Sequence, residues 1–404
     1  MTKDDAMTHG TRGPAHPERK EIARYLLSRG LDAIDQAPDP VRMAELAAPL
    51  DATVAGAVAS GFAFPDGLEP KPKPISPAPS PDDPLPRADV VVITWTVDEL
   101  VGLAHVLTPG VTPARWHRYA HNFADYKPKI RAHAPAANSG RLGSYMPTRV
   151  GDTAVLCMKS ELHLNQDGVK TAEGKATLPV KDLFQQIIAE TGASLILTVG
   201  TAGSVFTDFQ LGDIVVTRAA KFRLQNEFRN EDFNGKAYRS DWALPTTHLD
   251  TAQSLMKTLV GQLAEPGFGP PHPGFLPSGP LLLPPANDPD IKLELGGRDM
   301  PEFHPILTTD YFEYGTTTNH LDVEGAAVEM GDAALGLACC ELADPPRWAV
   351  VRNMSDPVIN GDLPAKQFHL NEQTTWAVGY YTAYGVWTST IGALTTWGIL
   401  AGLT

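Results

Sequence analysis

Residues 194–205 read SLILTVGTAGSV, an apolar run that ends in small residues. Up to Gly200 the run lacks the polar/apolar alternation of a half-exposed strand, and it is typical of a strand buried on both faces of a sheet. The same texture recurs at 88–94 (ADVVVIT), 152–158 (DTAVLCM), 213–217 (DIVVT), 305–309 and 348–353. These stretches predict the strands of one buried sheet.

Stretches with helical spacing of apolar residues separate these strands. One such pattern follows the first strand, and residues 178–191 form an amphipathic pattern that ends at Gly192. Further helices are expected at about 249–263 and 324–340. Strands that alternate with helices predict a layered α/β domain.

The chain before residue 88 has a different composition. Residues 1–64 carry apolar residues at helical spacing and predict a small N-terminal helical extension. Between Pro65 and Pro86 nine of 22 residues are proline, which excludes a regular helix or a central strand. We therefore expect a Pro-rich linker at 65–87 and the main domain at 88–404, with a Pro/Gly-rich insertion loop at 266–285.

Composition narrows the class of protein. The net charge of −14 opposes the phosphate backbone, so general binding of DNA or RNA is not expected. Three cysteines fit buried side chains in a reducing compartment better than a disulfide framework. The N-terminus has no apolar run typical of a secretory signal. The uncharged stretch 376–404 is either a buried terminal helix, which its threonines and glycines favour, or a membrane anchor; a cytoplasmic location without membrane contact is expected.

Polar residues that directly follow the predicted strands are candidates for a site, because ligands of such sheets bind at the strand ends. The small residues of TVGTAGSV (198–205) either form a tight turn or let the backbone approach a ligand. Glu324, in LDVEGAAVEM (321–330), either caps a helix or accepts hydrogen bonds from two sugar hydroxyls.

Two further motifs carry charged residues. WAVVRNMSDP (348–357) brings Arg352, Ser355 and Asp356 to the end of a strand. Asp356 is either a turn former or an acid that gives a proton to a leaving group. Glu99, in TWTVDELVG, either favours the first helical turn or points into the cleft.

In this order, TVGTAGSV with LGDIVV, VEGAA and VVRNMSD resembles the nucleoside phosphorylase/nucleosidase superfamily, which includes purine nucleoside phosphorylases and methylthioadenosine/S-adenosylhomocysteine nucleosidases. The resemblance covers roughly residues 89–400. It implies a three-layer catalytic domain with a central mixed sheet flanked by helices. It also implies cleavage of the bond between a purine base and its ribose, in a homo-oligomer. No metal or organic cofactor is suggested.

The resemblance also implies roles for individual residues. Glu324 holds the ribose hydroxyls, and the preceding position, usually methionine, is Val323. Asp356, with Ser355 before it, protonates purine N7 as the base leaves, and Arg352 matches the arginine of the same strand. Phe312 either stacks on the base or is a core aromatic. Thr201 hydrogen-bonds the attacking water, and Gly203 belongs to the same substrate-binding turn.

Two features favour hydrolysis over phosphorolysis. Phosphorolytic relatives generally place a phosphate-binding arginine before the VGS/T motif, where this chain has Thr198. Hydrolytic relatives place a glutamate after the first strand to position or activate water, and Glu99 lies at that offset. We therefore expect a nucleosidase acting on a purine nucleoside or nucleotide. The alternatives are a phosphate-dependent phosphorylase and a catalytically silent nucleoside-binding protein.

The segment 108–150 reverses the charge of the chain. It holds seven lysines and arginines against one acid, Asp125: Arg115, Arg118, Lys127, Lys129, Arg131, Arg141 and Arg149. The segment is either a solvated loop or subunit contact, or it holds the 5′-phosphate of a nucleotide substrate. A further alternative is that the N-terminal region gates the activity of the domain.

Overall fold

A computed structural model describes residues 61–164, 169–242, 246–263, 291–293, 304–363 and 372–403. The expected helical extension lies outside these residues except for 61–64, and the insertion loop at 266–285 lies outside them entirely.

The described residues form a 12-stranded sheet. Its strands are β1 (Val90–Thr94), β2 (His117–Tyr119), β3 (Gly143–Val150), β4 (Thr153–Ser160), β5 (Leu195–Ser204), β6 (Ile214–Thr217), β7 (Ala219–Phe222), β8 (Ala237–Arg239), β9 (Ile291–Leu293), β10 (Ile306–Thr308), β11 (Ala327–Glu329) and β12 (Arg347–Asp356). The paired order is β2-β3-β4-β1-β5-β11-β10-β7-β8, while β12 pairs with β5 and β6, and β6 with β9. β4, β1, β5 and β12 run parallel, whereas β11 and β6 pair antiparallel with β5 and β12. The expected mixed sheet is confirmed.

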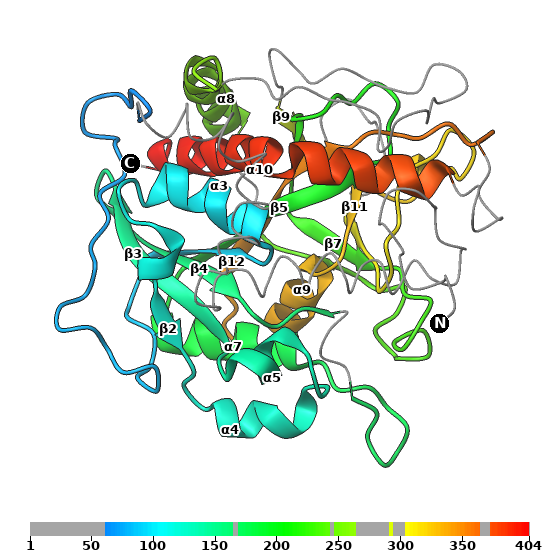
Figure 1. The fold of residues 1–404 in the computed structure, drawn as a ribbon, viewed down its shortest axis with the longest axis horizontal. Helices are drawn as coiled ribbons and strands as arrows, with labels where there is room; N and C mark the ends of the chain where they lie inside the picture. The colour runs from blue at the N-terminus through cyan, green and yellow to red at the C-terminus, as the bar shows by residue number, and fades with distance from the viewer. Residues whose placement is uncertain are drawn as a thin grey trace, which may run out of the picture.

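Helices cover both faces of this sheet. They are α3 (Val97–Leu107), α4 (Phe123–Tyr126), α5 (Pro135–Ser139), α7 (Pro179–Thr191), α8 (Thr246–Val260), α9 (Asp332–Cys340) and α10 (Glu372–Ala401). Figure 1 shows α10 lying along α3 and close to α8 on one face, while α7 and α9 lie together on the other. This is the three-layer α/β arrangement that the sequence predicts.

Strand β1 shows why the apolar runs become central strands. Val90 and Val92 belong to the hydrophobic cluster under α3 and α10, whereas Val91 and Ile93 belong to the cluster on the α7 and α9 side. Successive side chains of a strand point to opposite faces, so a strand covered on both faces has to be apolar throughout.

The helix expected at about 324–340 begins later, at Asp332. Residues 327–329 form strand β11 instead, which pairs with β10 and β5. Gly325 lets this stretch lie close to the residues that precede β10, because a Cβ at Gly325 would lie 2.6 Å from the carbonyl oxygen of Pro305. Tertiary strand pairing therefore overrides the helical propensity of the Ala-rich stretch.

The C-terminal stretch forms the long helix α10. As expected for a helix that packs on the sheet, it contributes buried side chains to the hydrophobic cluster, among them Trp376, Ile391, Leu394 and Trp397. Among the described helices, none is both long and apolar enough to cross a membrane.

The described part of the Pro-rich segment lies against the main domain (Figure 1, blue). The ring of Phe64 lies 4.9 Å from that of Trp397, and the carbonyl of Leu68 accepts a 2.8 Å hydrogen bond from the Trp397 indole. The backbone of Lys71 exchanges hydrogen bonds with that of Arg149. The domain boundary near Ala88 stays a prediction, but residues 61–87 contribute to the packing of α10.

We expect a chain that begins at residue 88 to unfold at a lower temperature than one that begins at residue 61. Loss of the Phe64 and Leu68 contacts exposes Trp397, and we expect the Tm to fall by about 5 °C or more. Thermal unfolding of the two chains, followed by circular dichroism, checks this. Equal Tm values would mean that the segment only rests on the surface.

Candidate active site

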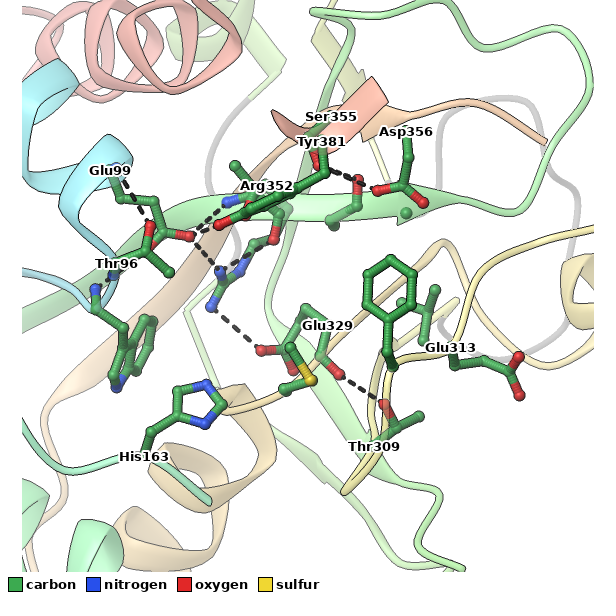
Figure 2. A pocket seen from close by; sticks show the side chains of 17 residues that line it. Thr96, Glu99, His163, Thr309, Glu313, Glu329, Arg352, Ser355, Asp356 and Tyr381 are labelled. Atoms are coloured by element: carbon green, nitrogen blue, oxygen red, sulfur yellow. Dashed lines mark hydrogen bonds and ion pairs between the residues drawn. The ribbon is translucent and has the colours of Figure 1, made fainter. Parts of the chain in front are cut away.

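The carboxyl ends of β1, β5 and β12 meet at a cavity of about 60 Å³. Residues after β10 and within β11 line the opposite side, and Tyr381 reaches in from α10 (Figure 2). Ligand pockets usually measure about 300–1,000 Å³, so this cavity is small for a ligand site. Among the described residues, no group of three His, Cys, Asp or Glu side chains has the arrangement of a metal site.

Arg352 of β12 is the charged centre of the cavity wall. Its Nε and Nη2 atoms donate hydrogen bonds of 2.8 and 2.6 Å to the two carboxylate oxygens of Asp332. Nη2 also lies 3.2 Å from Glu329, and Nη1 lies 3.9 Å from Glu99. The guanidinium stacks on Trp95, with 5.0 Å between Cζ and the ring centroid. One buried cation therefore serves three buried carboxylates.

Glu99 occupies the third position of α3 and closes its first turn. Oε2 accepts hydrogen bonds from Thr94 Oγ1 and from the backbone amides of Trp95 and Thr96, at 2.9–3.0 Å. Oε1 accepts from the amide and hydroxyl of Thr201, at 2.9 and 3.0 Å. Burial alone would raise the pKa of Glu99, but Arg352 and these amides outweigh it and hold the pKa below its ordinary value. Glu99 is therefore an ionised group with all its acceptor positions in use.

Glu329, at the end of β11, caps the start of α9. Its carboxylate accepts hydrogen bonds from the amides of Gly331 and Asp332, and the Thr308 hydroxyl contacts it as well. Burial and the adjacent Asp332 raise the pKa of Glu329 to about 8, against the opposing effect of Arg352. A proton retained on Glu329 lowers the excess of negative charge around Arg352.

Asp356 has a different environment from the other acids. Oδ1 accepts a 3.1 Å hydrogen bond from the Ser355 hydroxyl, while the buried Oδ2 has no partner among the described residues. Burial raises its pKa to about 7, with the Ser355 hydrogen bond opposing. Asp356 is therefore an acid that holds its proton near neutral pH and presents an unused oxygen to the cavity (Figure 2).

Two glycines of β5 make room for these side chains. A Cβ at Gly200 would overlap Arg352 Nη1 and Glu99 Oε1, and a Cβ at Gly203 would lie 2.9 Å from Asp356 Oδ2. The small residues of TVGTAGSV thus allow acidic and basic side chains to approach the backbone of the central strand.

The structure brings most of the expected site residues to one cavity. Those that line it are Glu99, Thr201, Gly203, Phe312, Arg352, Ser355 and Asp356. It does not bring Glu324 or Val323 there. Glu324 is 35% exposed and pairs with Arg223 and Lys221, and Val323 is 65% exposed. Glu324 and Val323 lie outside the cavity because this stretch forms a 3-10 turn and a loop, whereas α9 begins only at Asp332.

The cavity also contains residues that the sequence did not indicate. Glu329 and Met330 lie five and six residues beyond the position expected for the sugar-binding acid, in the sequence VEMGDAA (328–334). This second acid–Ala motif was the available signal. Trp95, His163 and Tyr381 also line the cavity, and no sequence pattern marks them. Burial lowers the pKa of His163 to about 3, so this side chain is neutral.

The basic segment 108–150 lies away from the cavity lining. Lys129 and Arg131 pair with Asp182 and Glu227, at 2.7 and 2.9 Å, and the buried Arg141 pairs with Glu161. Acids from outside the segment therefore pair with three of its seven cations. Cys340 is exposed, whereas Cys157 and Cys339 are buried as expected.

Comparison with known proteins gives matches only among solved structures. No family model and no curated protein matches the chain. Futalosine hydrolase of Helicobacter pylori is 12% identical, with a TM-score of 0.42, over 77% of this chain and 96% of that chain. The chain is similar to solved nucleosidases.

Two further structures extend this similarity. The 5′-methylthioadenosine/S-adenosylhomocysteine nucleosidase of H. pylori is 11% identical, with a TM-score of 0.43, over 78% and 97% of the two chains. The S-adenosylhomocysteine nucleosidase of Streptococcus pyogenes is 15% identical, with a TM-score of 0.43, over 79% and 99%. The motifs resemble the same kind of enzyme. At these identities and TM-scores the similarity says nothing about the activity of this chain.

We expect Arg352→Gln to destabilise the protein by about 3–5 kcal/mol, because it leaves three buried carboxylates without their cation. Arg347→Gln is the matched control, since Arg347 lies exposed at the start of the same strand. Urea unfolding of both variants checks this. A loss below about 1 kcal/mol for Arg352→Gln would show that the cluster needs no buried cation.

The raised pKa of Asp356 predicts a pH dependence of stability. The folded state keeps the proton that the unfolded state gives up near its ordinary pKa of 3.8, and the folded pKa is about 7. The contribution of Asp356 to the free energy of unfolding is therefore complete below about pH 3.8. It is lost as the pH rises from there through 7, at up to about 1.4 kcal/mol per pH unit. Between about pH 4 and 7 the free energy of unfolding of Asp356→Asn, measured by urea denaturation, should fall less steeply than that of wild type. Parallel curves would contradict the raised pKa.

Proposed function

We propose that this protein is a nucleosidase that hydrolyses the N-glycosidic bond of a purine nucleoside or nucleotide to free base and (phospho)ribose. Asp356 is the observation that carries the proposal. Its buried carboxyl, with a pKa raised to about 7 and a free Oδ2, suits a group that donates a proton to a departing base. A purine that leaves without a proton at N7 carries negative charge and is a poor leaving group.

Another part of the cavity wall, formed by Thr201 and Glu99, suits the attacking water. The Thr201 hydroxyl donates its proton to Glu99 and is within hydrogen-bonding reach of Tyr381, so its remaining lone pair is the one that can accept a water proton. Glu99 has no spare acceptor position, which supports a positioning role through Thr201 rather than direct proton abstraction. Negative charge around Arg352 would stabilise the oxocarbenium character of the sugar.

The reaction then balances as follows. The oxygen of water bonds to C1′ while the C1′–N9 bond breaks and its electron pair goes to the base. Asp356 gives its proton to N7. Water loses a proton to solvent, and Asp356 regains one from solvent.

Charge in the cavity favours hydrolysis over phosphorolysis. Arg352 is the one arginine or lysine among the described residues that line the cavity. Its guanidinium already donates two hydrogen bonds to Asp332. His163 is neutral because burial lowers its pKa to about 3. Phosphate would meet the ionised Glu99 without an available cation, and this carboxylate would repel it.

Phe312 lines the cavity together with Gly203 and Asp356. Its ring is available for a base whose N7 reaches Asp356, and such stacking contributes about 1 kcal/mol. A silent binding protein would have no need of a buried acid with a free oxygen and a raised pKa, and this favours an enzyme. The homo-oligomeric assembly and cytoplasmic location remain predictions.

The test is release of free base from purine nucleosides and nucleotides, with and without phosphate. We expect phosphate-independent release whose kcat/KM falls as the pH rises through about 7, because Asp356 must be protonated. Asp356→Asn should lower kcat by about 10²–10⁴-fold. Glu324→Gln is the control, since Glu324 lies outside the cavity, and it should leave kcat nearly unchanged.

Each other outcome selects an alternative. Release only with phosphate would make the protein a phosphorylase. Binding without release would make it a silent nucleoside-binding protein. Equal activity of wild type and Asp356→Asn would remove Asp356 from the mechanism.

A further inference from the structure

The carboxylates around the cavity have little hydrogen-bonding capacity left for a ligand. A carboxylate offers about four acceptor positions. Glu99 accepts from Thr94, Trp95, Thr96 and twice from Thr201. All of its capacity is therefore used within the protein.

Glu329 is saturated in the same way. It accepts from the amides of Gly331 and Asp332, from the Thr308 hydroxyl and from Arg352. These bonds cap α9, so releasing them for a ligand would leave buried amides without acceptors.

Glu313 is the remaining glutamate of the described cavity lining. It accepts from Arg223 at 3.0 Å, from the Tyr311 hydroxyl at 2.7 Å and from the amide of Tyr314 at 3.2 Å. At most one acceptor position is left on it. A pair of vicinal hydroxyls needs two.

Several hydroxyl side chains of the lining already donate their proton within the protein, among them Thr201, which donates to Glu99. Thr309 donates to the carbonyls of Tyr311 and Glu329, and Ser355 donates to Ala202 and Asp356. Phe312, Val328 and Met330 add apolar groups to the lining, and the buried indole Nε1 of Trp95 has no partner among the described residues. The acidic oxygen that is free for a ligand, Asp356 Oδ2, is assigned above to the base.

We propose that this site does not recognise the 2′,3′-diol of the sugar and accepts purine 2′-deoxyribonucleosides as well as ribonucleosides. This inference rests on the proposed nucleosidase function. A site built to hydrogen-bond a hydroxyl rejects the analogue that lacks it by about 10⁴–10⁵-fold, because its own polar groups are left unpaired. Here the carboxylates of Glu99, Glu313 and Glu329 are already hydrogen-bonded within the protein, so loss of the 2′-hydroxyl leaves none of them without a partner.

Binding separates recognition from the different chemical reactivity of the two sugars. We would measure Kd by calorimetry on Asp356→Asn, using adenosine, inosine and guanosine beside their 2′-deoxy counterparts. For the base that binds, we expect the two Kd values to agree within about tenfold. A ribonucleoside that binds more than about tenfold tighter than its 2′-deoxy counterpart would overturn the inference.

Two variants locate any preference for the diol. Glu313→Gln alters the remaining glutamate of the lining, and Glu324→Gln alters a neighbour that contacts the same Arg223 outside the cavity. We expect the ratio of the two Kd values to be the same in both variants. A change in that ratio confined to Glu313→Gln would show that Glu313 holds the diol and would also overturn the inference.

Base release by the wild-type protein distinguishes failure of this inference from failure of the proposed nucleosidase function. Cleavage of a ribonucleoside, with no binding of its 2′-deoxy counterpart, would leave the proposed function standing and remove this inference. Neither binding nor cleavage of any of the six compounds or their 5′-phosphates would overturn the proposed function and this inference with it.

Discussion

The ion cluster of Arg352 with Glu99, Glu329 and Asp332 is the constraint on which the rest of the site depends. It joins the last strand of the sheet to the starts of α3 and α9, since Glu99 and Asp332 lie in the first turns of those helices. Charges this deeply buried are tolerated only when they are paired and hydrogen-bonded. The positions of two helices and one strand are therefore fixed by the same guanidinium.

This cluster can form only because β5 carries glycine where side chains have to pass. Arg352 and Glu99 approach the strand at Gly200, and Asp356 approaches it at Gly203. The Gly-rich turn thus organises side chains of other elements rather than holding a ligand by itself.

The cavity places carboxyl groups with opposite properties close together. Arg352 and backbone amides hold the pKa of Glu99 below its ordinary value, whereas burial without a cation raises the pKa of Asp356 to about 7. One acid is kept charged and the other is kept protonated at the same pH. Environments that separate pKa values in this way are typical of sites that combine electrostatic stabilisation with proton donation.

The sequence by itself determined the layered fold and much of the site. The apolar runs of β1, β4, β5, β6 and β12 are unambiguous because strands covered on both faces have to be apolar. Glu99, Arg352 and Asp356 could be found because they lie near the carboxyl ends of such strands or directly after them. Only the tertiary structure decided which acid of LDVEGAAVEMGDAA enters the cavity. The pairing of β11 with β5 and β10 carries Glu329 inward and leaves Glu324 outside, and such non-local pairing leaves no trace in local periodicity. The pairing of each carboxylate, and hence its charge, was likewise settled by burial and by neighbours that are distant in the chain.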